Sequence, residues 1–107
     1  ELDLAGSLAD AFGATLTFAR IKMIIITSAS ANGDTISVGG AAANGFVNWV
    51  ADSTDKLVIR PKGGFCLVAP DATGYAVTAG TGDLLKIEND DSGDTATYDI
   101  LIAGCSA

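Results

Sequence analysis

One short device occurs three times along this chain: a Gly-Asp pair followed at once by β-branched or aliphatic residues. Its copies are Gly33-Asp34-Thr35-Ile36, Gly82-Asp83-Leu84-Leu85 and Gly93-Asp94-Thr95-Ala96. Glycine supplies the positive φ that a tight turn needs, and the aspartate oxygen caps the turn by accepting hydrogen bonds from nearby backbone N–H groups. The residues that follow favour strands. The device therefore predicts short strands joined by tight turns.

Further strand patterns follow one another about every ten residues, a spacing typical of sandwiches and barrels. We expect strands at 1–4, 16–27, 35–38, 56–60, 65–69, 75–78, 84–87 and 95–102, and a type I′ hairpin turn at Asn32-Gly33. No long helical pattern is present. The sequence thus predicts an all-β fold, a small antiparallel β-sandwich or jelly-roll-like barrel of seven to eight short strands. The residues expected to form its core are Ile21, Met23, Ile25, Ile36, Val38, Leu67, Ile100 and Ile102.

The length of 107 residues predicts one domain, residues 1–107, with one core. The chain begins at Glu1 rather than at a methionine, so we expect the full protein to have further residues ahead of it. No apolar run reaches the roughly 18 residues that a membrane-spanning helix needs.

Charge and composition disfavour most functional classes. Thirteen acidic residues against six basic ones give a net charge of −7, which repels nucleic acid and anionic membranes. The chain has no histidine, so it lacks the commonest general base and the commonest transition-metal ligand. A paired-carboxylate hydrolase stays open, because two aspartates can meet in space. We expect a protein that is not an enzyme, with no catalytic residues and no cofactor.

The two cysteines, Cys66 and Cys105, each lie in or beside an apolar run that reads as a strand. Free cysteines are among the most buried residues, so two buried free thiols are expected. One disulfide between them is the alternative. A metal site is disfavoured because no CxxC motif and no histidine accompany them.

An acidic stretch runs from Glu88 to Asp94. Clustered oxygen ligands around a glycine can hold Ca²⁺, but the glutamate that closes an EF-hand loop is missing. We expect a solvated hairpin loop and no metal site, with calcium binding as the alternative.

Four residues are candidates for contacts with a partner: Phe46, Trp49, Arg60 and Lys62. Arg60 and Lys62, together with Lys56, make a cationic spot that can meet an acidic surface, unless they only form a solvated turn. Phe46 and Trp49 have helical spacing. They predict a short helix or a loop with a docked Trp49, and we expect both rings to be buried under the sheet or between subunits.

Leu8 and Phe12 are spaced four residues apart. They predict one helical turn, or a loop that tucks both side chains under the sheet.

The course of the chain resembles a group of small tailed-phage and prophage virion structural proteins. The likeness covers nearly the whole chain, and the segments that carry it are 2–13, 16–22, 38–40, 60–64, 69–77 and 98–104, with Arg60-Pro61-Lys62-Gly63-Gly64 and Ala69-Pro70-Asp71-Ala72-Thr73-Gly74 among them.

The resemblance implies a non-enzymatic capsid decoration, or cement, protein or another head accessory, which stabilises the particle. Such a protein would self-associate, with a trimer favoured, and would bind capsid or other virion proteins. It would be part of the virion, assembled in the host cytoplasm, where Cys66 and Cys105 would stay reduced. The alternative is a carbohydrate- or receptor-binding β-sandwich module of a phage tail or fibre.

Overall fold

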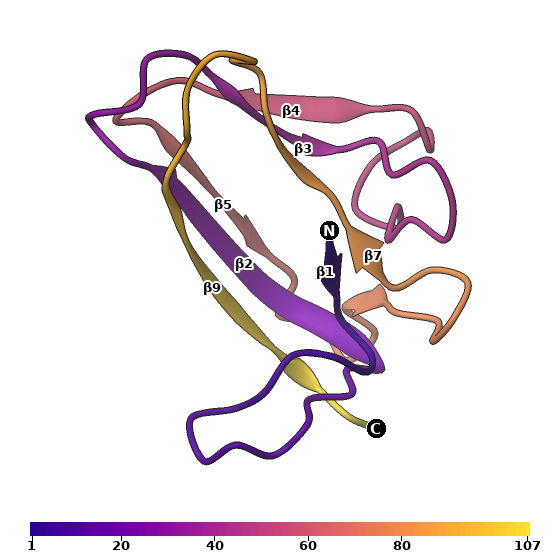
Figure 1. The fold of residues 1–107 in the computed structure, drawn as a ribbon. Helices are drawn as coiled ribbons and strands as arrows, with labels where there is room; N and C mark the ends of the chain where they lie inside the picture. Colours follow the sequence, from indigo (N-terminus) through magenta and orange to yellow (C-terminus); the bar gives the residue numbers. More distant parts are fainter.

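The computed structural model describes residues 1–107 and is all-β, as the sequence predicts. Short antiparallel strands form three small sheets (Figure 1). The strands are β1 (Leu2–Asp3), β2 (Arg20–Ser28), β3 (Ile36–Gly39), β4 (Lys56–Ile59), β5 (Gly64–Val68), β6 (Tyr75–Ala76), β7 (Leu84–Leu85), β8 (Ile87–Asn89) and β9 (Tyr98–Cys105). The sheets do not close into a barrel. There is no helix, and hence none that is able to cross a bilayer.

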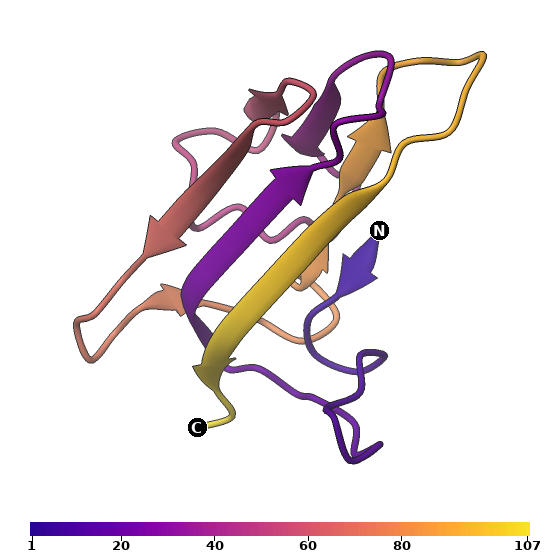
Figure 2. The same ribbon diagram turned by 90° about the vertical axis from the view of Figure 1, so that its left-hand side faces the viewer.

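The largest sheet has β2 at its centre. β5 pairs with one side of β2 and β9 with the other, while β6 pairs with the first residues of β2. Figure 2 shows β5, β2 and β9 side by side, seen from outside the molecule. A second sheet has the order β4-β3-β8, and β1 pairs with β7.

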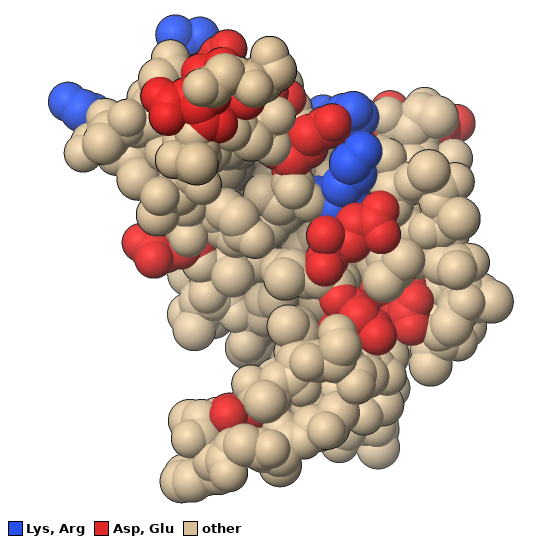
Figure 3. All heavy atoms as spheres, in the orientation of Figure 1, with Lys and Arg blue, Asp and Glu red and all other residues tan.

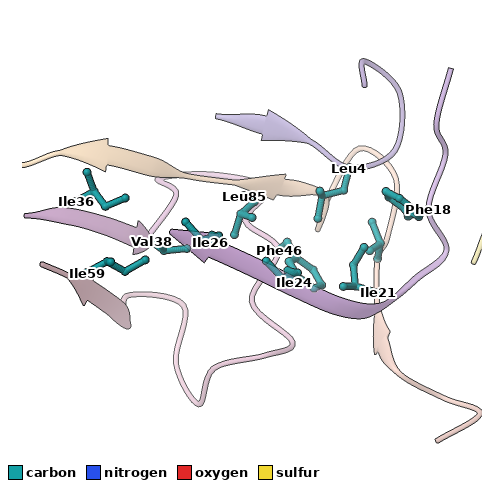
Figure 4. Packing of buried hydrophobic residues seen from close by; sticks show 11 residues of the cluster. Leu4, Phe18, Ile21, Ile24, Ile26, Ile36, Val38, Phe46, Ile59 and Leu85 are labelled. Atoms are coloured by element: carbon teal, nitrogen blue, oxygen red, sulfur yellow. The ribbon is translucent and has the colours of Figure 1, made fainter. Parts of the chain in front are cut away.

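One hydrophobic core lies between these sheets, and Figure 4 shows its side chains gathered in a single cluster. Ile24 and Ile26 come from β2, and Ile36, Val38 and Ile59 come from the β3–β4 pair. The whole cluster consists of Leu4, Phe18, Ile21, Ile24, Ile26, Ile36, Val38, Phe46, Ile59, Val77 and Leu85. The predicted core positions Ile21, Ile36 and Val38 are confirmed, and Leu67, Ile100 and Ile102 are half-buried and pack against the cluster.

A β-bulge in β2 overturns two of the core predictions. Ile21 pairs with Gly104 of β9 and Met23 pairs with Ala103, so Lys22 is an extra residue in β2. One extra residue reverses which side chains face the core, because successive side chains of a strand point to opposite faces. Ile24 and Ile26 are therefore buried. The expectation that Met23 and Ile25 share the core face with Ile21 is wrong.

The three Gly-Asp pairs act through their aspartates. Asp34 accepts a hydrogen bond from the N–H of Thr35, and Asp94 accepts one from Thr95 in the same way. Asp83 is buried and accepts one from Gly80. The glycines of the three pairs do not have a positive φ, so that part of the prediction is wrong. In the turn that contains Asp83, the glycine with a positive φ is Gly80, three residues earlier.

Asn32 does not form the predicted type I′ turn, because neither it nor Gly33 has a positive φ. Its buried side chain instead joins two loops. The amide donates to Ser28 Oγ at 2.9 Å and to the Thr97 carbonyl at 2.8 Å, and its oxygen accepts from the Thr97 N–H at 2.9 Å. This residue thus positions the chain that leads into β9.

Candidate functional site

The most unusual surface of the molecule is the side of the large sheet that is turned away from the core. We call it the outer face and define it by Met23, Ile25, Cys66, Val68, Leu101 and Ala103. Ile25 lies between Cys66 of β5 and Leu101 of β9, and Met23 lies between Val68 and Ala103. Nothing lies in front of these strands in Figure 2.

Two side chains of the outer face are strongly exposed for apolar residues: Val68 is 54% exposed and Leu101 is 55% exposed. Among residues Met23 to Thr27 of β2 and their partners in β5 and β9, the only charged side chain on the outer face is that of Asp99. Contiguous apolar surface of this kind marks interaction sites on soluble proteins. The bulge at Lys22 creates the outer face, because it turns Met23 and Ile25 outward.

The predicted contact residue Phe46 belongs to the hydrophobic core, and Trp49 packs against that core. Phe46 is 2% exposed, so its ring has almost no surface to offer a partner. Trp49 is half-buried; its indole N–H donates to the Phe46 carbonyl at 3.0 Å. Its ring stacks on Phe65, with ring centroids 5.9 Å apart and an interplanar angle of 18°. Of the two predicted conformations, the segment forms a loop with a docked Trp49 and not a helix.

The predicted cationic residues Arg60 and Lys62 are exposed in the turn between β4 and β5. The Gly63 N–H donates to the Arg60 carbonyl, and Lys62 takes a φ of 67°. Lys56 lies at the other end of β4, about 14 Å from Arg60 along an extended strand. The structure therefore does not bring Lys56 to this spot.

Lys56 instead takes part in a small charged cluster around Glu88. Its ammonium lies 3.4 Å from the Glu88 carboxylate, and that of Lys86 lies 3.5 Å away. The hydrogen bond from Lys56, followed by the charge of Lys86, lowers the pKa of Glu88 below its ordinary value. Figure 3 shows basic side chains flanked by acidic ones on this side of the molecule. Exposed ion pairs of this kind contribute little to stability or to a site.

The only other clear pKa shift belongs to a turn. The backbone N–H of Thr54, followed by its hydroxyl, donates to Asp52 and lowers the pKa of that carboxyl group. Both groups are exposed and belong to the turn before β4.

The acidic loop from Glu88 to Asp94 is not the expected hairpin loop, because β8 pairs with β3 and β9 pairs with β2. Its carboxylates accept hydrogen bonds from other groups of the protein. Asp90 accepts hydrogen bonds from the hydroxyls of Thr35 and Ser37 at 2.6 and 2.9 Å. Asp91 accepts from the N–H of Gly93. No three carboxylate or thiol groups of the molecule converge as metal ligands would.

The two cysteines lie on opposite sides of β2. Cys66 is opposite Ile25 and Cys105 is opposite Arg20, so they are about 17 Å apart along the strands and about 10 Å apart across them. The expectation of two free thiols is confirmed, since a disulfide requires Cα atoms within about 7 Å. The expectation that both are buried is wrong, because Cys66 is exposed on the outer face.

The expectation that Phe12 is tucked under the sheet is wrong, as is the expectation of a helical turn from Leu8 to Phe12. Phe12 is 96% exposed, whereas Leu8 packs against the core as expected. Phe12 lies at the tip of a loop whose two arms bridge at Ala9 and Thr15. The carboxylate of Asp10 accepts hydrogen bonds from the N–H groups of Phe12 and Ala14, which orders the tip.

No pocket opens into the surface. Large apolar side chains are presented to solvent on the outer face, at the Phe12 tip and on β4, where Val58 is 58% exposed. Comparisons of the chain with protein-family models, with curated proteins and with solved structures found no match.

Proposed function

We propose that this protein is a non-enzymatic structural protein of a tailed-phage particle: a capsid decoration, or cement, protein or another head accessory. It self-associates and binds the particle through flat apolar surface. The observation that carries this proposal is the outer face, an apolar and almost uncharged surface on a chain of net charge −7. The resemblance of nearly the whole chain to phage virion proteins supports the choice of particle.

The energetics favour a covered outer face. About half of the Val68 and Leu101 side chains remains in water. Covering the exposed part of either side chain with a partner would contribute about 2 kcal/mol to the free energy of association, at 25 cal/mol per Å² of apolar surface. The acidic residues elsewhere keep the free protein soluble.

The interior suits a particle component that turns over no substrate. Every buried polar side-chain atom has a hydrogen-bond partner. Asp34, Asp83 and Asp94 each bond to the backbone of their own turn. We take the finer architecture to be a jelly-roll-like sandwich of two facing layers, an arrangement that recurs in capsid proteins.

The second candidate function is a carbohydrate- or receptor-binding module of a tail or fibre. The Phe12 tip favours it, because a nearly fully exposed ring held by an ordered turn can stack on a sugar. A single ring is a small platform, and the outer face has no role in this alternative.

Binding to phage heads stripped of their accessory protein tests the proposal. The wild type should bind, and Val68→Lys should lose most of the binding because it places a charge on the outer face. Thr81→Lys is the matched control, since it adds the same charge at an exposed loop position. The proposal would be overturned in favour of the receptor-binding module if the wild-type protein did not bind stripped heads but did bind glycans, and if Phe12→Ala abolished the glycan binding.

A further inference from the structure

The outer edge of β9 offers unpaired backbone groups. β9 pairs with β2 on one side and with nothing on the other. The N–H of Ala29 donates to the Thr97 carbonyl at 3.0 Å, just beyond the end of the paired strands. Hydrogen-bonded pairs alternate along an antiparallel ladder. Asp99, Leu101 and Ala103 therefore bond to β2, and the N–H and C=O groups of Tyr98, Ile100, Ile102 and Gly104 point away from it.

This edge lacks the features that usually prevent strands from pairing between molecules. Proteins protect edges with lysine, proline, bulges or short strands. β4 has Lys56 at its start and Arg60-Pro61 directly after it, and β8 consists of three residues with Glu88 at its centre. β9 has eight residues, no lysine, arginine or proline, and the single charge of Asp99.

We propose that a second copy of this chain pairs with the edge of β9, antiparallel, about a two-fold axis at Leu101. The proposal rests on the proposed function, in that it names the contact by which the particle protein self-associates. An antiparallel strand paired with its own copy matches donors to acceptors by symmetry. Only the register centred on Leu101 engages all four outward residues: Tyr98 faces Gly104 of the other copy, and Ile100 faces Ile102.

The side chains agree with this register. Leu101 meets its own copy on the outer face, in a pair whose Cα atoms lie about 4.5 Å apart, so each half-exposed leucine covers the other. Asp99 lies opposite Ala103, which separates the two Asp99 carboxylates by about 13 Å along the strands. That distance exceeds the Debye length of about 8 Å at physiological salt, so their repulsion is weak.

The pairing joins the two large sheets into one and brings the two outer faces together as one continuous apolar surface. The contact itself is small. Seven paired residues extend over about 24 Å, and such a strip buries less than the roughly 800 Å² per partner of a stable complex. We therefore expect micromolar dissociation in solution, and tighter association where a repeated capsid surface holds neighbouring copies together. A two-fold pair also differs from the trimer that the resemblance implies.

Disulfide trapping tests the register. In a background with Cys66→Ser and Cys105→Ser, Leu101→Cys places two thiols at the axis, within the Cα range that a disulfide accepts. Ala103→Cys is the control, because the two copies of residue 103 are offset by four residues along the paired strands. Mild oxidation should convert most of the Leu101→Cys protein to covalent dimer and little of the control. Equal crosslinking of the two variants, or none at Leu101→Cys, would overturn the register.

Sedimentation equilibrium tests the pairing itself. The wild type should pass from monomer to dimer as its concentration rises, and Leu101→Lys should stay monomeric with a similar melting temperature, because residue 101 is half-exposed in the single chain. Thr81→Lys should behave like the wild type. A wild type that remains monomeric at millimolar concentration, or that forms a trimer, would refute the pairing.

Failure of the pairing and failure of the proposed function give different results. A wild type that stays monomeric but binds stripped heads would refute the pairing through β9 and would still support the particle role. A wild type that forms dimers but does not bind heads would refute the particle role, and the dimer would then not be a contact between particle proteins.

Discussion

The neighbouring residues Ile24 and Ile25 provide the sharpest test of the fold. The structure buries Ile24 to 1% exposure and places Ile25 on the outer face, because Lys22 is an extra residue in β2. The alternation of the sequence instead predicts Ile25 as a core residue and leaves Ile24 out of the core. Ile24→Ala and Ile25→Ala remove the same atoms from adjacent positions, so each variant controls for the other.

The magnitudes follow from burial. Each substitution removes three carbon groups, worth about 0.8 kcal/mol each when fully buried, or about 2.4 kcal/mol in total. At Ile24 the cavity left in the core adds to this, so we expect a loss of about 3 to 4 kcal/mol in the free energy of unfolding. At Ile25 the side chain is partly covered and its removal leaves no closed cavity, so a smaller loss of about 1 to 2 kcal/mol is expected.

Urea denaturation of dilute protein, followed by circular dichroism, measures both values. The midpoint should fall much further for Ile24→Ala, with the same slope for both variants. For a domain of this size, a difference of 2 kcal/mol corresponds to roughly 8 to 16 °C in melting temperature. If Ile25→Ala proved as costly as Ile24→Ala, or more so, the bulge and the outer face that depends on it would both be wrong.

Three further outcomes are expected. Trp49→Ala removes the ring that stacks on Phe65 and should lower the free energy of unfolding by about 2 kcal/mol in urea; an unchanged midpoint would show that the ring does not stabilise the single chain. In the folded protein, without reductant, Cys66 should react with a thiol reagent and Cys105 should react more slowly. If no thiol reacted after unfolding without reductant, the assignment of both cysteines as free would be contradicted. Glu88→Gln should lower the melting temperature only slightly at pH values above 4.5, the ordinary pKa of Glu88, and this small difference should vanish as the pH falls through the lowered pKa of Glu88 in the folded state. A difference that persists in strong acid would show that the two lysines are not its cause.

The all-β class, the positions of most strands and the capping role of the aspartates were readable in the sequence. These features are local: strand propensity, alternation and the reach of an aspartate side chain to a backbone N–H one to three residues away are set within a few residues. Ile36 and Val38 were assigned to the core correctly because β3 contains no irregularity.

The places where sequence reasoning failed depend on distant partners. The bulge at Lys22 forms because β9 pairs with β2 at Gly104 and again at Ala103, and nothing near Lys22 in the sequence indicates this. A side chain at position 104 would overlap the Arg20 carbonyl and the Phe18 ring, so the close approach of the two strands requires glycine there. Asn32 reads as a turn residue, and only the fold places Thr97 beside it.

The candidate site follows from the same cause. Local pattern placed Ile100 and Ile102 of β9 on the core side, as the structure does, but it assigned the residues of β2 after Lys22 to the wrong faces. One extra residue in β2 decides the faces, since side-chain direction alternates with a period of two. The sequence therefore determined that the molecule would be built from short strands on tight turns, and the tertiary pairing of β2 with β9 decided which half of their apolar side chains became core and which became surface.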